Sequence, residues 1–193
     1  MHSIDQQCDL GADLLRLARG SIEHGLAHNE PLPIRFEGMP DVMTDPAATF
    51  TTLRLNGKLR GCVGNLESER PLARDVAHTA FRAAFRDPRF EPVVQHELSA
   101  ILVEVAVLSP MEPFAVRGEA ELLARLEPGE DGLVIGFGAK RATFLPKVWE
   151  QLPKPAAFLA ALKMKCGLEK DFWSQQLEFH RYKTTTYTEL AEN

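Results

Sequence analysis

Cysteine is scarce in this 193-residue sequence, which holds three cysteines at distant positions, Cys8, Cys62 and Cys166. No two of them are separated by only two residues, so the spacing typical of zinc knuckles and redox motifs is missing. An odd, dispersed set also argues against the disulfide framework of a small secreted domain. Cysteine usage therefore favours a reducing compartment, and we expect a cytoplasmic protein.

Long apolar runs and an excess of basic residues are missing as well. The chain has no stretch of about 18 consecutive apolar residues, the length that spans a bilayer. Its first residues, MHSIDQQCDLGADLLRLA, lack the basic start and long apolar segment of a signal peptide. Lys and Arg number 22 against 27 Asp and Glu, which gives a net charge of −5. Non-specific nucleic-acid surfaces normally need the opposite balance, so we expect neither a membrane segment nor a nucleic-acid partner.

The remaining composition is ordinary for a globular protein, with 45% hydrophobic and 25% charged residues. Apolar residues at spacings of three and four predict helices over 9–28, 70–86 and 154–168. Alternation and β-branched residues predict strands over 48–55, 58–63, 99–109, 131–137, 140–145 and 176–185. Because helices and hairpins are mixed without regular strand–helix alternation, an α+β fold is favoured over a doubly wound parallel sheet.

The stretch LNGKLRGCVGNLE, at 55–67, concentrates glycine and basic residues between a predicted strand and a predicted helix. Asn56-Gly57 is a strong signal for a hairpin turn. The later glycines have two interpretations: a backbone cradle for an anion, or a bulge or close backbone approach where strands bend and pack. The spacing lacks the Lys-Ser/Thr of a phosphate loop, which favours the second interpretation. The candidate ligand-binding residues of this stretch are Arg60, Gly61, Gly64 and Asn65.

Cys62 is the candidate nucleophile of the sequence. The nearby Arg60 and the start of the following helix would favour a reactive thiolate. The competing interpretation is a small buried hydrophobic residue, since free cysteine is among the most buried residue types. His180, on the last predicted strand, is a candidate acid–base group or a structural histidine.

Glu104 is a single carboxylate on an otherwise apolar strand, and such a group needs a partner or a watery cleft. The candidate cationic partners are Arg60, Arg89 and Arg141. A structural ion pair is slightly favoured over a role in a site, and Arg89 and Arg141 are also candidate ligand-binding residues. His24 and His28 share a helical spacing that binds metals in some proteins, but no HExxH motif is present. We therefore expect no metal and no cofactor.

Several segments in order resemble the AMMECR1 domain family, whose signature is close to LRGCIG. The matching segments are LRGCVG at 59–64, PL at 71–72, AFRDPRF at 84–90, ILVEVAVLS at 101–109, GLVIGFGAKRATFLPKVW at 132–149 and Y.TTTYTE at 182–189. The length and the N-terminal helix are similar to the free-standing prokaryotic members, called AmmeMemoRadiSam system protein A.

This resemblance implies a single AMMECR1 domain over 1–193 with a two-lobed α+β fold and mixed or antiparallel sheets packed by helices. The approximate lobes are 1–110 with 170–193, and 111–169, with the crossing expected around 110–128. The LRGC-type run is expected near a cleft. Gene context in such members implies a Memo-type dioxygenase-like partner and a radical-SAM partner. The family's reaction is unsettled, so a cleft-centred ligand-binding or enzymatic role stands beside a non-catalytic interaction module and a nucleic-acid-associated protein.

Overall fold

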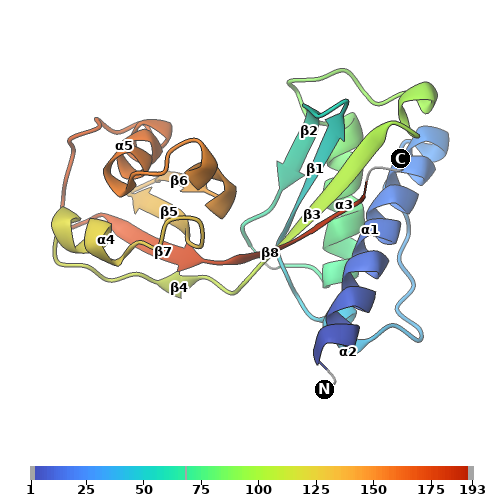
Figure 1. Ribbon diagram of the computed structural model, residues 1–193, viewed down its shortest axis with the longest axis horizontal. Helices are drawn as coiled ribbons and strands as arrows, with labels where there is room; N and C mark the ends of the chain where they lie inside the picture. Colours follow the sequence, from blue (N-terminus) through green and yellow to red (C-terminus); the bar gives the residue numbers. More distant parts are fainter. Residues whose placement is uncertain (1–2, 68, 191–193) are drawn as a thin grey trace. The chain divides into compact units, whose positions relative to one another are not determined.

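Two compact units make up the chain in this computed structural model, which describes residues 3–67 and 69–190. The first unit runs to Leu108 and resumes at Thr185, and the second is Ser109–Thr184. Each unit has its own four-stranded sheet and its own hydrophobic core (Figure 1). The α+β class expected from the sequence is confirmed.

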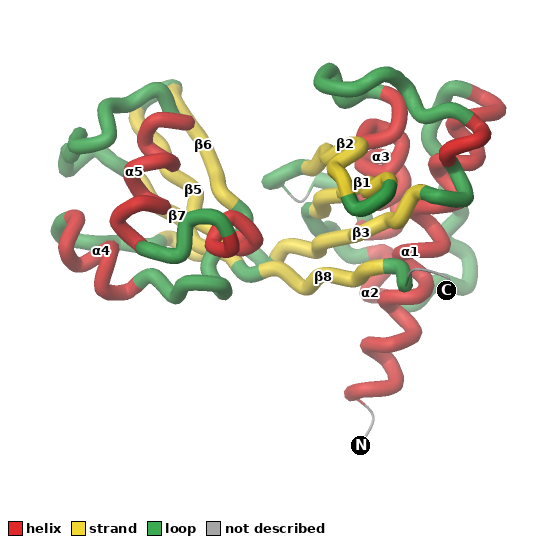
Figure 2. Tube along the Cα trace, turned by 45° about the horizontal axis from the view of Figure 1, so that its top comes forward, coloured by secondary structure: helices red, strands yellow, loops and turns green. Residues whose placement is uncertain are grey.

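The first unit packs two long helices against one face of its sheet (Figures 1 and 2). The sheet has the strand order β2-β1-β3-β8, and β1 is antiparallel to both neighbours. Residues Leu14, Leu53, Val76 and Val103 are fully buried between the layers. The elements are α1 (Ser3–His28), α2 (Asp41–Thr44), β1 (Thr49–Leu55), β2 (Lys58–Gly64), α3 (Leu72–Phe85), η1 (Gln95–Glu97), β3 (Ile101–Leu108) and β8 (Thr184–Thr188).

The β1–β2 hairpin turns at the predicted dipeptide and then bulges. Asn56 and Gly57 have φ angles of 50° and 75°, the positive values that a type I′ turn requires. Leu53 pairs with Gly61, but Arg54 pairs with Leu59. Arg60 therefore has no partner position on β1, and this extra residue shifts the register of the rest of β2.

A buried carboxylate ties α3 to the hairpin. Asp75 is fully buried near the start of α3 and accepts hydrogen bonds from the Thr49 backbone N–H (2.9 Å) and hydroxyl (2.8 Å). The Asn65 amide donates to its other oxygen at 2.7 Å. Thr79 links the hydroxyls of Thr49 and Thr51. Burial of the charge is tolerated because both of its oxygens are hydrogen-bonded.

The second unit has the strand order β4-β7-β5-β6. Its core is built around Phe158, whose ring stacks on Trp149 with centroids 3.8 Å apart. Phe114, Leu133 and Leu162 close this core. The elements are β4 (Glu112–Pro113), α4 (Glu119–Arg125), β5 (Gly132–Phe137), β6 (Lys140–Phe144), η2 (Pro146–Glu150), α5 (Pro155–Lys165) and β7 (Glu178–Tyr182).

The last predicted strand, 176–185, differs from the structure. It contains β7, which pairs with β5 in the second unit, and the first residues of β8, which lies in the sheet of the first unit. Residues 170–184, expected in the first lobe, therefore lie in the second unit. The pattern predicts a single strand across Lys183, because β7 and β8 are both extended. Alternation is the same in any strand, so it does not show which sheet the strand joins. No described helix is long and apolar enough to cross a membrane.

Candidate functional site

Three side chains of different chemistry form a row across the first sheet. Thr52, on the central strand β1, pairs with Cys62 of β2 on one side. On its other side it pairs with Glu104 of β3. Residues directly opposite each other on neighbouring strands point to the same face of a sheet. A thiol, a hydroxyl and a carboxylate are thus adjacent on one face.

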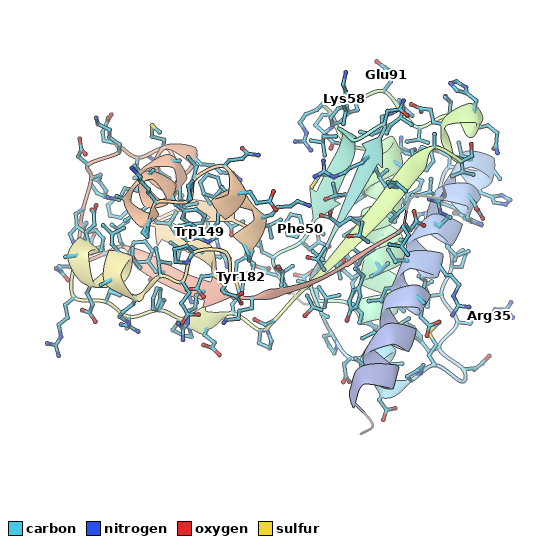
Figure 3. The ribbon with its side chains drawn as sticks, viewed as in Figure 1. Arg35, Phe50, Lys58, Glu91, Trp149 and Tyr182 are labelled. Atoms are coloured by element: carbon cyan, nitrogen blue, oxygen red, sulfur yellow. The ribbon has the colours of Figure 1, made fainter. Side chains whose placement is uncertain are left out.

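This row points away from the helices. Thr51 contacts the α3 hydroxyl of Thr79, and a Cβ on Gly61 would meet the Ala83 carbonyl of α3. Val103 belongs to the core beneath α1 and α3. These three residues alternate with the row, so the row occupies the opposite face. Phe50, labelled in Figure 3, is the next residue on that face of β1.

Within the row, the Thr52 hydroxyl donates a hydrogen bond to the Cys62 sulfur at 3.4 Å. Cys62 is half-buried, whereas Glu104 is 8% exposed. Cys62 is therefore not part of the fully buried core, and partial exposure is the first requirement for a nucleophile. The interpretation of Cys62 as a fully buried hydrophobic residue is therefore wrong.

The backbone of Cys62 is held by side chains from the turn after α3. Asp87 accepts the Cys62 N–H at 2.9 Å, and Arg89 donates to the Cys62 carbonyl at 3.0 Å. Arg89 and Asp87 are themselves paired at 2.6 Å. Because β2 is the edge strand, this pair occupies the hydrogen-bonding position of a further strand. The Arg89 hydrogen bond, with the N–H groups of Cys62 and Arg89, holds the pKa of Asp87 well below its usual range.

Arg60, a candidate anion-binding residue, is engaged within the protein. Its guanidinium makes two hydrogen bonds to Glu97, at 2.8 and 2.9 Å, and one to the Glu91 carbonyl at 2.9 Å. The hydrogen bond from Arg60 lowers the pKa of Glu97. An anion at this position would have to compete with that two-fold pair.

The candidate residues Gly61, Gly64 and Asn65 each have a structural contact. A Cβ on Gly61 would lie 2.1 Å from the Ala83 carbonyl oxygen, and one on Gly64 would lie 2.2 Å from the Phe50 ring. Asn65 donates to Asp75. The close approaches agree with the interpretation of the glycines as packing positions, and a ligand role for the three residues stays a prediction.

The structure divides the remaining candidates between the two units. Cys62, Glu104 and Arg89 lie in the first unit, whereas His180 and Arg141 lie in the second, on β7 and β6. His180 lines a hollow of about 300 Å³ together with aromatic side chains of the same unit. No group of three or more His, Cys, Asp or Glu suited to a metal occurs within the described part of the chain.

Sequence reasoning missed two residues of this site, Thr52 and Asp87. Alternation places Thr52 on the face opposite Thr51, but only the bulge at Arg60 brings Cys62 opposite Thr52. Asp87 directly follows the predicted helix 70–86, and its contact with Cys62 joins residues 25 positions apart. Gly61 and Gly64 indicate a bulge or a close backbone approach in this stretch, but neither the position of the bulge at Arg60 nor the Asp87 contact has a local pattern from which it could be predicted.

Helices packed on one face of an antiparallel hairpin sheet, with a half-buried thiol on the other face, define an α+β protein with a candidate thiol site. The sequence model of the AMMECR1 family matches residues 15–187, and the chain belongs to this family. A protein of Methanothermobacter thermautotrophicus is 36% identical over 183 residues, which cover 94% of this chain and 95% of the relative. A Methanocaldococcus jannaschii protein is 34% identical and covers 93% and 90%.

The fold also matches a solved structure. The crystal structure of uncharacterised protein PH0010 from Pyrococcus horikoshii superposes with a TM-score of 0.82 at 29% identity. The match covers 90% of this chain and 88% of that chain. The fold is therefore shared over most of both chains.

Proposed function

We propose that this AMMECR1-family protein is a cytoplasmic ligand-binding or enzymatic protein whose site is the sheet face that carries Cys62, Thr52 and Glu104. The observation that carries the proposal is the row itself. A half-buried cysteine has a hydroxyl donor on its sulfur, and a carboxylate lies one strand further on. The cleft expected beside the LRGC-type run belongs to this proposal, as do Memo-type and radical-SAM partners.

The row supports a polar ligand with an electrophilic centre. A thiol attacks as its thiolate, and the Thr52 hydroxyl that donates to the Cys62 sulfur would orient it toward such a ligand. Glu104 lies where a carboxylate can accept or return a proton from a bound ligand. Asp87 and Arg89 fix the Cys62 backbone, so the thiol is presented from a rigid edge strand.

The thiol can be tested by alkylation with iodoacetamide, followed by peptide mass spectrometry. Cys166 is the internal control, because it is 6% exposed and burial raises the pKa of its thiol. We expect Cys62 to be alkylated at least about tenfold faster than Cys166 in the folded protein. Thr52→Val should slow the reaction at Cys62 and leave Cys166 unchanged.

The ligand can be sought by protection of the same thiol. Fractions of polar cellular metabolites are added before iodoacetamide, and a ligand on this face should slow alkylation of Cys62 but not of Cys166. If Cys62 reacts no faster than Cys166, and if no fraction protects it, the thiol site is refuted. Where a fraction does protect Cys62, the variant Arg60→Gln tests whether Arg60 binds the ligand. Loss of protection with unchanged Cys62 reactivity would assign Arg60 to ligand binding.

An interaction module is the second candidate, favoured by two exposed apolar side chains of the first unit. Leu59 is 41% exposed and Val94 is 45% exposed. Leu59 is the residue before Arg60, and Val94 lies three residues after Glu91. The Arg60 guanidinium donates a hydrogen bond to the Glu91 carbonyl and so links the two segments. The double variant Leu59→Ser, Val94→Ser should weaken co-purification with Memo-type or radical-SAM proteins, whereas Cys62→Ala should not. Equal recovery of partners with both variants would count against this module.

A further inference from the structure

A second hollow lies in the second unit, whereas Cys62 lies in the first. It is lined mainly by charged side chains, unlike the aromatic hollow beside His180. Its volume is about 310 Å³, and its lining includes three carboxylates and two cationic side chains. The lining residues that matter here are Glu112, Glu127, Asp131, Arg181, Tyr182 and Lys183. Asp131 is fully buried, so among these residues it forms the floor.

Asp131 is fixed in place by three hydrogen bonds. Its Oδ2 accepts the Glu127 N–H at 2.9 Å, and its own N–H donates to the Glu127 carbonyl at 3.0 Å. Its carbonyl accepts the indole N–H of Trp149 at 2.8 Å. Asp131 and Trp149 therefore hold the turn 127–131 rigidly against the core of this unit.

One oxygen of this carboxylate is left over. Oδ1 of Asp131 is buried and has no hydrogen-bond partner among the described residues. A buried polar atom without a partner is destabilising, and more so where it carries charge. A rigid carboxylate with one unused oxygen is suited to receive an N–H donor from a ligand.

The cationic side chains of the hollow already have partners. Lys183 lies 3.3 Å from Glu127 and 3.7 Å from Glu130, and its side chain is 54% exposed at the rim. Arg181 lies 3.6 Å from Glu112. Glu112 and Glu127 thus each have a cationic partner in the lining. Asp131 is the carboxylate that remains, so the acidic excess of the hollow lies at Asp131.

Tyr182, another lining residue, is held rigidly on β7. Its ring packs so closely over Gly132 that a Cβ there would lie 2.5 Å away, and its hydroxyl contacts the Thr143 hydroxyl at 2.8 Å. Figure 3 labels Tyr182 and Trp149 within this unit. The hollow therefore combines a rigidly held strand with a fixed acceptor.

We propose that this hollow binds a small organic cation, through an ammonium or guanidinium group that donates hydrogen bonds to Oδ1 of Asp131. An organic group fits better than a metal ion, because the described residues offer no cluster of three metal-ligating side chains. The same chemistry can come from a free amine or from a basic side chain of a peptide.

The test is a titration of the ¹⁵N-labelled full-length protein followed by amide chemical shifts. The probes are putrescine, agmatine, a Gly-Arg-Gly peptide and the neutral 1-butanol. We expect saturable shifts at 127–131 and at Lys183 with the cationic probes and none with 1-butanol. Tighter binding of the peptide would identify a protein side chain as the source, and tighter binding of agmatine would identify a free amine.

Variants of opposite expected sign make the test decisive. Asp131→Asn keeps an acceptor for the Glu127 N–H but removes the charge, and should weaken binding about tenfold or more. Lys183→Ala removes a competing cation and should tighten binding several-fold. Glu169→Gln, which alters an exposed carboxylate outside the lining, should change nothing.

The proposal is overturned if 1-butanol shifts the same amides as the cations do, or if no cationic probe gives a saturable shift. It is also overturned if Asp131→Asn folds and binds as tightly as the unaltered protein. Should Asp131→Asn fail to fold, Glu127→Gln replaces it as the weakening variant. Equal affinity of Glu127→Gln and Lys183→Ala would then refute the site.

Discussion

Asp87 shows how one residue can set the geometry of a neighbouring strand. It lies outside the sheet, yet its carboxylate receives the backbone N–H of Cys62 and the guanidinium of Arg89. The AFRDPRF segment therefore has a physical purpose, which is to complete the hydrogen bonding of the edge strand that carries the thiol. The charged form of Asp87 is the form that performs this task.

We predict that Asp87 contributes to stability above its unfolded pKa and that this contribution is lost in acid. The Arg89 hydrogen bond lowers the pKa of Asp87 in the folded protein from its usual 3.8. A lowered folded pKa means that the unfolded state binds more protons as pH falls below about 4, so acid favours unfolding. Urea unfolding at pH 6 and pH 3 should show a smaller loss for Asp87→Asn than for the unaltered protein.

The matched control for Asp87 is Asp171→Asn. Asp171 has an 88% exposed side chain, and its ion pair with Lys170 is long, at 4.0 Å. This variant should keep the pH dependence of the unaltered protein. An Asp87→Asn protein that loses as much stability between pH 6 and pH 3 as the unaltered protein would show that Asp87 is not a source of the acid sensitivity.

At the scale of single residues, the sequence predicts which residues have unusual chemistry better than it predicts which residues they contact. Glu104 stood out as one charge in an apolar strand, and Cys62 as a thiol between glycines, and both lie in the row. Thr52 did not stand out, since threonine is common in strands and its relation to Cys62 depends on register. Arg60 was interpreted from its charge alone, and its partner Glu97 lies on a separate element.

At the scale of elements, α1 contains three glycines, and two of them, Gly20 and Gly25, have opposite surroundings. The helix runs unbroken from Ser3 to His28, although glycine is an unfavourable residue in a helix interior. A Cβ on Gly20 would meet only Leu32, at 3.6 Å. A Cβ on Gly25 would lie 2.4 Å from the Phe85 ring and 2.8 Å from the Phe81 ring. Gly25 thus allows α1 to approach α3, whereas Gly20 has no such close contact.

We predict opposite effects of alanine at these two positions. Gly20→Ala should stabilise the protein by about 0.5–1 kcal/mol, because alanine loses less conformational entropy in a helix. Gly25→Ala should destabilise it by about 1–3 kcal/mol, because two aromatic rings must move. Denaturant unfolding of both variants measures the difference. A stabilising Gly25→Ala would show that the contact between α1 and α3 adapts without cost.

The elements themselves were largely predictable, because long periodic segments and the Asn-Gly turn are local signals. Helices α1, α3 and α5 and strands β1, β2, β3, β5 and β6 lie where periodicity placed them. A bulge is indicated by the glycines of β2, but its position at Arg60 and the change of sheet between β7 and β8 were not predictable. Both depend on which distant strand is paired and in which register, and the alternation of residues along a strand carries no information about either.

At the scale of the whole molecule, the two units differ in continuity. The second unit is one segment that contains all strands of its sheet and its own buried cluster. The first unit needs the end of the chain. Glu189 accepts hydrogen bonds from Arg19 at 2.7 Å and from the Val103 N–H at 2.8 Å, and its own N–H donates to the Val103 carbonyl.

We therefore predict that a fragment of residues 109–184 folds alone, whereas a fragment of residues 1–108 is destabilised by loss of β8 and Glu189. Both tryptophans of the chain, Trp149 and Trp173, lie in the second unit, so their fluorescence reports that unit. The 109–184 fragment should melt cooperatively with the emission maximum of the full chain. Addition of a peptide spanning 184–190 should raise the melting temperature of the 1–108 fragment, read by circular dichroism. A 109–184 fragment with the emission of an unfolded chain would show instead that its core depends on the first unit.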